Sequence, residues 1–130
     1  MASELRVNTL KDAAGNNSIA TSFVAGGSAK VHAHYNQNTT TVNTSFNVAS
    51  ITDNATGDSQ CNYTASLDAV NYCLQVSGKT DDNNTDSTGN RLWVLPYEST
   101  ASNGSAFCTD TGGTERDPKI LCYTTHGDLA

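Results

Sequence analysis

Positive charge is scarce in this sequence. Lys and Arg together account for only 7 of the 130 residues, against 13 Asp and Glu, which gives a formal net charge of −6 and a pI near 4.7. The field around such a chain repels phosphate, and no cluster of Lys or Arg reverses that field locally. We therefore expect no nucleic acid partner.

Long apolar runs are also missing. No run approaches the roughly 18 residues of a membrane span, and the opening residues Met1 to Glu4 lack the basic and then apolar order of a signal peptide. We therefore expect no association with a membrane. We also expect a chain that is made, and first folded, in a reducing cytoplasm.

The four cysteines follow no metal-binding spacing. They stand at positions 61, 73, 108 and 122, with no Cys-x-x-Cys pair and no Cys/His cluster of zinc type. Two disulfides in three pairings are conceivable, or none. Because no secretion signal is visible, and because Cys61 and Cys122 lie in segments typical of a strand core, free thiols are the favoured interpretation.

Signatures of catalysis and of metal binding are absent or incomplete. There is no Gly-x-Ser-x-Gly elbow and no pair of carboxylates placed for acid and base roles. His32 and His34 would share one face of a strand, but no third ligand accompanies them, so two solvent-facing histidines are the favoured interpretation. We expect no enzymatic activity, no metal site and no cofactor.

A stretch that begins like a calcium loop does not continue as one. Residues 82–86 place oxygen ligands at alternate positions. Ser87 then occupies the place of the invariant Gly, and Trp93 that of the bidentate Glu, so an EF-hand is excluded. A solvated loop is the better interpretation.

The residues that are abundant favour strands and turns. Ser, Thr and Asn make up roughly a third of the chain, whereas Leu, Ile, Val and Phe together fall below roughly 20%. Apolar residues recur with period two in segments 5–10, 19–23, 31–35, 44–48, 61–63, 72–76 and 120–124. In segment 92–95 both faces are apolar, which predicts a strand covered on both sides. We expect an all-β fold with almost no helix, a small antiparallel β-sandwich or jelly-roll-like domain with a thin core.

The N-terminal segment differs in character from the rest. It contains two weak strands around a polar turn and ends in Gly26-Gly27, a possible hinge. We expect an extended docking arm over residues 1–27 and a β-sandwich domain over residues 28–130. The alternative is that these strands edge the main sheet. The alternating apolar residues that would dock the arm are Leu5, Val7, Leu10, Ile19 and Phe23.

Several stretches, in order, carry a family resemblance. They are Ser3 to Asp12 followed by Gly15-Asn16-Asn17-Ser18, Gly27 to Val31, Ser45 to Val48, Ser50 to Asn54 with Gly57-Asp58, Asp68 to Tyr72, Asp117-Pro118 and His126 to Asp128. Together they resemble a domain that recurs in fibre-type and other virion proteins of tailed phages of marine bacteria, especially cyanobacteria. The sequence departs from that pattern at position 32, where a bulky aromatic is usual, and at positions 61, 108 and 122, where aliphatic residues are usual.

The resemblance implies a non-enzymatic structural protein of a bacteriophage virion, assembled in the host cytoplasm. It implies a short tail-fibre, knob or capsid-decoration appendage, because the chain has no heptad or collagen-like shaft. Its partners would be copies of itself in a homotrimer, other virion proteins and a host surface glycan. Composition alone equally allows dimers, and tail and head locations both stay open.

One alternative belongs to another class of protein. The chain could be a free-standing carbohydrate-binding or adhesin β-sandwich module in which Trp93 and Tyr97 contact a glycan. Co-purification distinguishes the two hypotheses. A virion protein co-purifies with particles at fixed stoichiometry, whereas a free carbohydrate-binding module is retained by glycans in the absence of particles.

Overall fold

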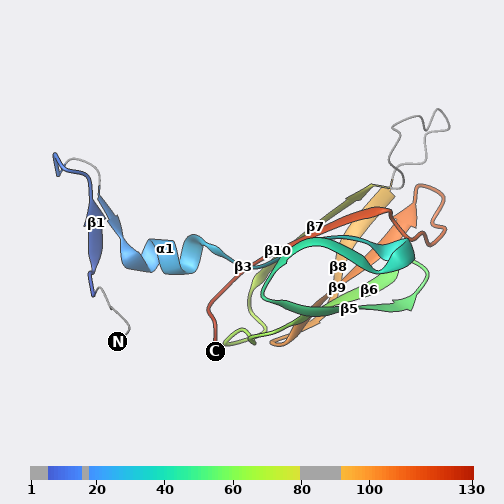
Figure 1. The fold of residues 1–130 in the computed structure, drawn as a ribbon. Coiled ribbons are helices and arrows are strands. Elements are labelled where there is room, and N and C mark those ends of the chain that lie inside the picture. Colours follow the sequence, from blue (N-terminus) through green and yellow to red (C-terminus); the bar gives the residue numbers. More distant parts are fainter. Residues whose placement is uncertain (1–5, 16–17, 80–91) are drawn as a thin grey trace.

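The computed structural model describes residues 6–15, 18–79 and 92–130 and is dominated by strands (Figure 1). The elements are β1 (Thr9–Lys11), β2 (Ser18–Ala20), α1 (Thr21–Gly27), β3 (Ala29–Asn36), the 3-10 turn η1 (Gln37–Thr39), β4 (Thr41–Phe46), β5 (Val48–Ala55), β6 (Asp58–Tyr63), β7 (Cys73–Lys79), β8 (Leu92–Thr100), β9 (Asn103–Asp110) and β10 (Ile120–His126). All neighbouring strands pair antiparallel.

Two four-stranded sheets form the body of the protein. We call them the β3 sheet, with strand order β4-β3-β10-β7, and the β9 sheet, with strand order β5-β6-β9-β8. The chain first crosses between them at Asn47, which adopts a φ of 57° between β4 and β5. The two sheets enclose a common core, so the predicted all-β antiparallel sandwich is confirmed.

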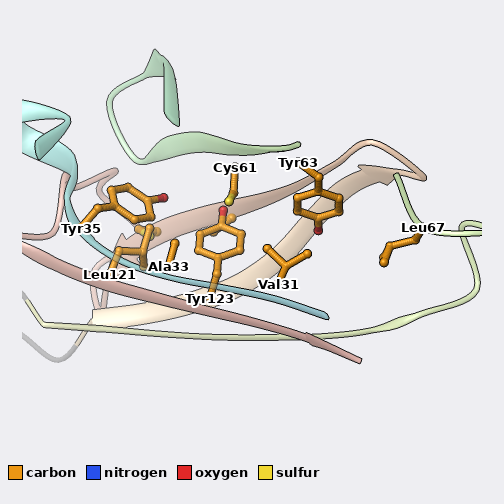
Figure 2. Close-up of a cluster of buried hydrophobic side chains, with 10 residues drawn as sticks. Val31, Ala33, Tyr35, Cys61, Tyr63, Leu67, Leu121 and Tyr123 are labelled. Carbon is orange, nitrogen blue, oxygen red and sulfur yellow. The ribbon is translucent and has the colours of Figure 1, made fainter. Parts of the chain in front are cut away.

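Alternate residues of the central strands fill the space between the sheets (Figure 2). The buried apolar side chains are Val31, Ala33, Tyr35, Cys61, Tyr63, Leu67, Ala106, Cys108, Leu121 and Tyr123. Tyrosines supply much of this volume, and a buried hydroxyl needs a hydrogen-bond partner. The Tyr35 hydroxyl lies 2.6 Å from Ser59 Oγ, and the Tyr123 hydroxyl donates to the Ser59 carbonyl at 3.0 Å.

The N-terminal segment stands beside the sandwich (Figure 1). β1 and β2 form a separate two-stranded sheet, with Leu10 opposite Ile19, and do not join either four-stranded sheet. The strand predicted for segment 19–23 is wrong beyond Ala20, because α1 begins at Thr21 and ends at Gly27. Five residues are too few to separate period two from a helical period.

The hydrogen bonds at the start of α1 explain part of this difference. The Thr21 amide donates to the Asn8 carbonyl at 3.0 Å, and the Thr21 hydroxyl lies 3.2 Å from the carbonyls of Val7 and Asn8. These contacts tie the start of the helix to the chain just before β1. Gly26 and Gly27 are the last residues of the helix, whereas the sequence predicted a hinge there.

Three other strand predictions need correction. Segment 44–48 is not one strand, because β4 ends at Phe46 and β5 begins at Val48 in the other sheet. β8 is an edge strand, and Trp93 and Leu95 are 59% and 53% exposed, so the segment is covered on one side only. In β10 the core-facing residues are Leu121, Tyr123 and Thr125, whereas the sequence predicted positions 120, 122 and 124. Both phases of β10 contain apolar residues, so the alternation alone could not select the buried one.

Candidate binding surfaces

The outer face of the β9 sheet carries a line of apolar side chains, of which Trp93, Leu95 and Tyr97 are exposed and Phe107 is half-buried. Ala106 and Cys108 point into the core, so Phe107 between them points outward, and Leu95 lies opposite Phe107 on β8. Tyr97 is on the same face, because its ring centroid lies 6.0 Å from that of Phe107. We call Trp93, Leu95, Tyr97 and Phe107 the apolar row.

A hydrogen-bonded set of amides and hydroxyls lies on the same face, across β9 from β8. Gln60 Nε2 donates to Asn62 Oδ1 at 2.6 Å. Asn62 Nδ2 lies 3.0 Å from Ser50 Oγ and 2.9 Å from Thr52 Oγ1. We call Gln60, Asn62, Ser50 and Thr52 the polar row.

Strand register places the two rows next to each other. Ser105 of β9 pairs with Gln60 on one side and with Tyr97 on the other. Phe107 likewise lies between Asp58 and Leu95. The two rows therefore form one continuous surface, with one strand between them.

The charge of this face has one sign. The four strands β5, β6, β8 and β9 contain Asp53, Asp58, Glu98 and Asp110 and no Lys, Arg or His. The Asp110 carboxylate is bound by residues of the loop after β9. Asp58 lies opposite the outward-pointing Phe107, so the charge placed on the outer face is acidic and disfavours anionic ligands.

The predicted glycan-contact residues Trp93 and Tyr97 therefore share one strand and one face. Sequence reasoning missed Leu95, Phe107 and the whole polar row. A period-two pattern through Trp93, Leu95 and Tyr97 was available in the sequence, but the assumption that both faces of the strand were covered concealed it. No local sequence pattern predicts the polar row, because its members come from two strands that folding brings into register.

The arm carries a second group of exposed apolar side chains. Val7, Leu10, Ile19 and Phe23 are 39%, 45%, 44% and 74% exposed, and no residue of α1 is buried. Leu5, also predicted to dock the arm, lies outside the described residues. Val24, at 43% exposed, belongs to the same group and was not predicted.

The predicted histidine pair lies on the outer face of the β3 sheet. His34 is opposite Cys122, and the His32 ring stacks on Phe46 with centroids 6.0 Å apart and planes inclined by 20°. Across residues 6–15, 18–79 and 92–130, no group of three or more His, Cys, Asp or Glu side chains is placed to hold a metal ion. The calcium-like run at 82–86 lies outside the described residues.

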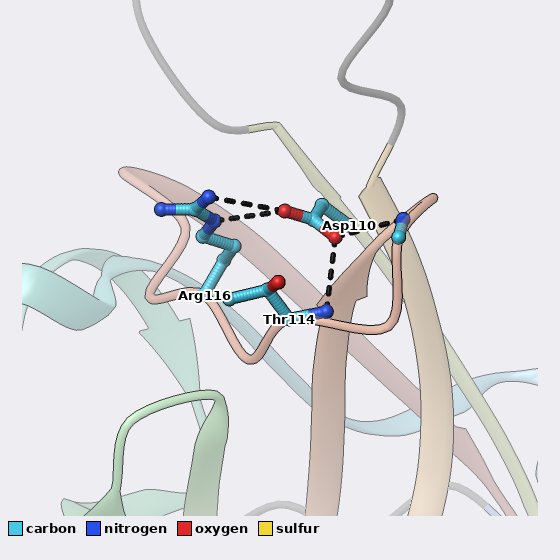
Figure 3. Close-up of polar contacts among 4 residues, drawn as sticks. Asp110, Thr114 and Arg116 are labelled. Atoms are coloured by element: carbon cyan, nitrogen blue, oxygen red, sulfur yellow. Dashed lines mark hydrogen bonds and ion pairs between the residues drawn. The ribbon is translucent and has the colours of Figure 1, made fainter.

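The loop after β9 is organised around Asp110 (Figure 3). Asp110 Oδ1 accepts hydrogen bonds from the backbone N–H of Thr114 at 3.0 Å and of Gly112 at 2.9 Å. Asp110 Oδ2 pairs with Arg116, whose Nε and Nη2 both lie at 3.1 Å. The Thr114 N–H is the main reason why the pKa of the Asp110 carboxyl is lowered, and Arg116 and Gly112 add to the effect. These contacts stabilise the loop, and both carboxylate oxygens of Asp110 are bonded within the protein itself.

The cysteines differ in environment. Cys61 and Cys108 are buried, Cys122 is half-buried and Cys73 is exposed, and all four are free thiols in the structure. Cys122 faces outward from β10 because Leu121 and Tyr123 occupy the core phase, which corrects its prediction as a core residue.

Comparison with known proteins provides no relative to reason from. No protein-family model, no curated protein and no solved structure matches the chain. In the part of the chain that the structure describes, no helix is long and apolar enough to cross a membrane.

Proposed function

We propose that this chain is a non-enzymatic structural protein of a bacteriophage particle, a short tail-fibre, knob or capsid-decoration appendage. In this proposal the arm attaches it to another virion protein and the sandwich faces outward. The observation that carries the proposal is the uncovered apolar surface of the arm, in a chain whose sequence resembles virion domains.

The arm is poorly suited to stand alone. A two-stranded hairpin is at best marginally stable in water, and a helix of seven residues is shorter than an isolated helix requires. Both become more stable when a neighbouring protein covers their apolar side chains or pairs with the free edges of β1 and β2. Docking on a neighbouring protein would therefore stabilise the arm.

The test is co-purification with particles at fixed stoichiometry, measured by mass spectrometry of purified virions. Phe23→Glu should lower incorporation at least about tenfold, because a carboxylate would be buried in the docking contact. Phe23 is 74% exposed in the free chain, so the variant should unfold at the same urea concentration as the native protein.

Val70→Glu is the matched control, since Val70 is 60% exposed on the sandwich and receives the same charge. It should be incorporated normally. Normal incorporation of Phe23→Glu, or absence of the native chain from particles, would contradict the docking role.

The apolar row favours a second candidate, a free-standing carbohydrate-binding module. Such a module would be retained by glycans in the absence of particles and would not be a stoichiometric component of virions. The same purification experiment therefore separates the two candidates.

A further inference from the structure

We propose that the outer face of the β9 sheet binds a neutral oligosaccharide or polysaccharide. Sugar rings would stack on the apolar row, and their hydroxyls would exchange hydrogen bonds with the polar row. The inference rests on the carbohydrate-binding candidate, to which it assigns a surface and a ligand class. An appendage that contacts a host glycan would use the same surface.

The two rows match the two kinds of surface that a sugar presents. A pyranose has faces of C–H groups, which pack on flat apolar side chains, and a rim of hydroxyls, which pair with amides and hydroxyls. Trp93 and Tyr97, which are 59% and 48% exposed, supply flat rings. The Asn62 side-chain amide donates hydrogen bonds to the hydroxyls of Ser50 and Thr52, so these groups are positioned before a ligand binds.

The geometry points to a chain of sugars. Trp93 and Tyr97 are four residues apart on β8, which corresponds to about 13 Å of strand. That separation exceeds the width of one sugar ring, so a monosaccharide would reach only one of the two aromatic side chains. An extended oligosaccharide could run along β8 and contact both.

The acidic charge of the sheet favours a neutral ligand over an anionic one. The four strands of the sheet carry acidic residues and no Lys, Arg or His. Sulfated or carboxylated polysaccharides would meet Asp58, which lies opposite Phe107, without any basic partner on these strands.

Charge also argues against a second copy of the chain on this face. A two-fold contact places the same patch against itself, so Asp58 would be covered by a copy of a sheet whose strands carry no Lys, Arg or His. Covering a carboxylate without a basic partner is unfavourable. A neutral glycan meets no such repulsion.

Native gel electrophoresis of the full chain through a panel of polysaccharides tests the proposal. The neutral members are hydroxyethylcellulose, galactomannan, xylan and laminarin, and the anionic members are alginate and dextran sulfate. We expect at least one neutral polysaccharide, and neither anionic one, to retard the protein. The chain has a single Trp, so the same ligand should shift the fluorescence emission of Trp93 and protect it from acrylamide quenching.

Variants locate the surface. Trp93→Ala and Tyr97→Ala should each weaken binding about tenfold, as expected for loss of one stacking contact. Asn62→Ala should weaken it by disordering the polar row. Val70→Ala is the control, because Val70 is an apolar residue, 60% exposed, that lies outside both rows and outside β4, and it should bind normally. Urea unfolding of each variant shows that it is folded.

Four results would overturn the proposal. The first three are no retardation by any neutral polysaccharide, retardation by the anionic ones as strong as by the neutral ones, and equal losses in Trp93→Ala and Val70→Ala. Dissociation of an oligomer by Trp93→Ala would instead assign the face to a second copy, which also overturns it. Incorporation into particles is measured separately with Phe23→Glu. A failure of glycan binding would therefore not affect the test of docking.

Discussion

Buried cysteines in this protein behave as small core residues. Burial raises the pKa of the Cys61 thiol to about 12. The pKa of Cys108 is also about 12, chiefly through burial and with smaller contributions from the charges of Asp117 and Asp58. Thiolate is the reactive form, so both thiols should be inert in the folded protein.

Thiol counting checks this expectation. At pH 8, an aromatic disulfide reagent should modify exposed Cys73 rapidly in the native protein, and Cys61 and Cys108 only as fast as the protein unfolds. In denaturant without reductant all four thiols should react. A count of two or none would show that disulfides form.

Asp110 contributes stability that depends on pH. Its folded pKa lies below the ordinary value, chiefly through the Thr114 N–H, so its contribution is present above about pH 4 and is lost as pH falls through the folded pKa. Asp110→Asn should therefore lower the urea midpoint at pH 7, and the difference from the native protein should shrink at pH 3.

The control for Asp110→Asn is Asp53→Asn, at an exposed position of β5. That variant should change the midpoint little at either pH. A deficit of Asp110→Asn that is constant from pH 7 to pH 3 would show that the loop needs only the shape of the side chain.

At the scale of elements, the turn between β5 and β6 is tightly constrained. Gly57 has a φ of 77°, and a Cβ there would lie 2.5 Å from the carbonyl oxygen of Cys108. Its own N–H donates to Asp117 Oδ1 at 2.7 Å, and its carbonyl accepts from the Cys108 N–H at 2.7 Å. The turn is thereby bound to both β9 and the segment that leads into β10.

Two glycine variants separate conformation from crowding. Gly113 has a φ of 80° but open space around it, so Gly113→Ala should cost about 1 kcal/mol of unfolding free energy, from the left-handed backbone alone. Gly57→Ala has the same conformational cost and also a backbone clash, so it should cost about 3 kcal/mol. Urea denaturation measures both, and equal costs would show that the turn can move away from Cys108.

At the scale of the whole molecule, the thin core makes self-association useful. We propose that the protein self-associates, because each interface buries strand surface that a single sandwich leaves exposed to water. The sequence resemblance favours a homotrimer, whereas composition equally allows a dimer. β4 is the natural edge for such a contact. It contains no charged residue, and all six of its residues are exposed, whereas edge strands are normally protected by charge.

Light scattering of the intact protein should report three chains at micromolar concentration. Asn43→Lys, which places a charge in the middle of β4, should shift the protein toward the monomer. Ala49→Lys, at an exposed position of neighbouring β5, is the control and should leave the mass unchanged. A monomeric native protein would contradict the trimer, and a trimeric Asn43→Lys would place the interface elsewhere.

The sequence by itself determined the fold class and much of the core. Period-two alternation is a local property, and it correctly predicted the buried phase of Val31, Ala33 and Tyr35 and that of Cys61 and Tyr63. Turn residues such as Gly57 could also be recognised locally, because the left-handed backbone favours glycine.

Only the tertiary structure decided which sheet, edge and face each strand occupies. Trp93 and Leu95 are exposed because β8 lies at an edge, and the buried phase of β10 depends on what packs against it. The polar row exists because pairing of β5 with β6 brings Ser50 and Thr52 to Asn62. Such juxtapositions depend on register between strands, and register is set by packing across the whole sandwich.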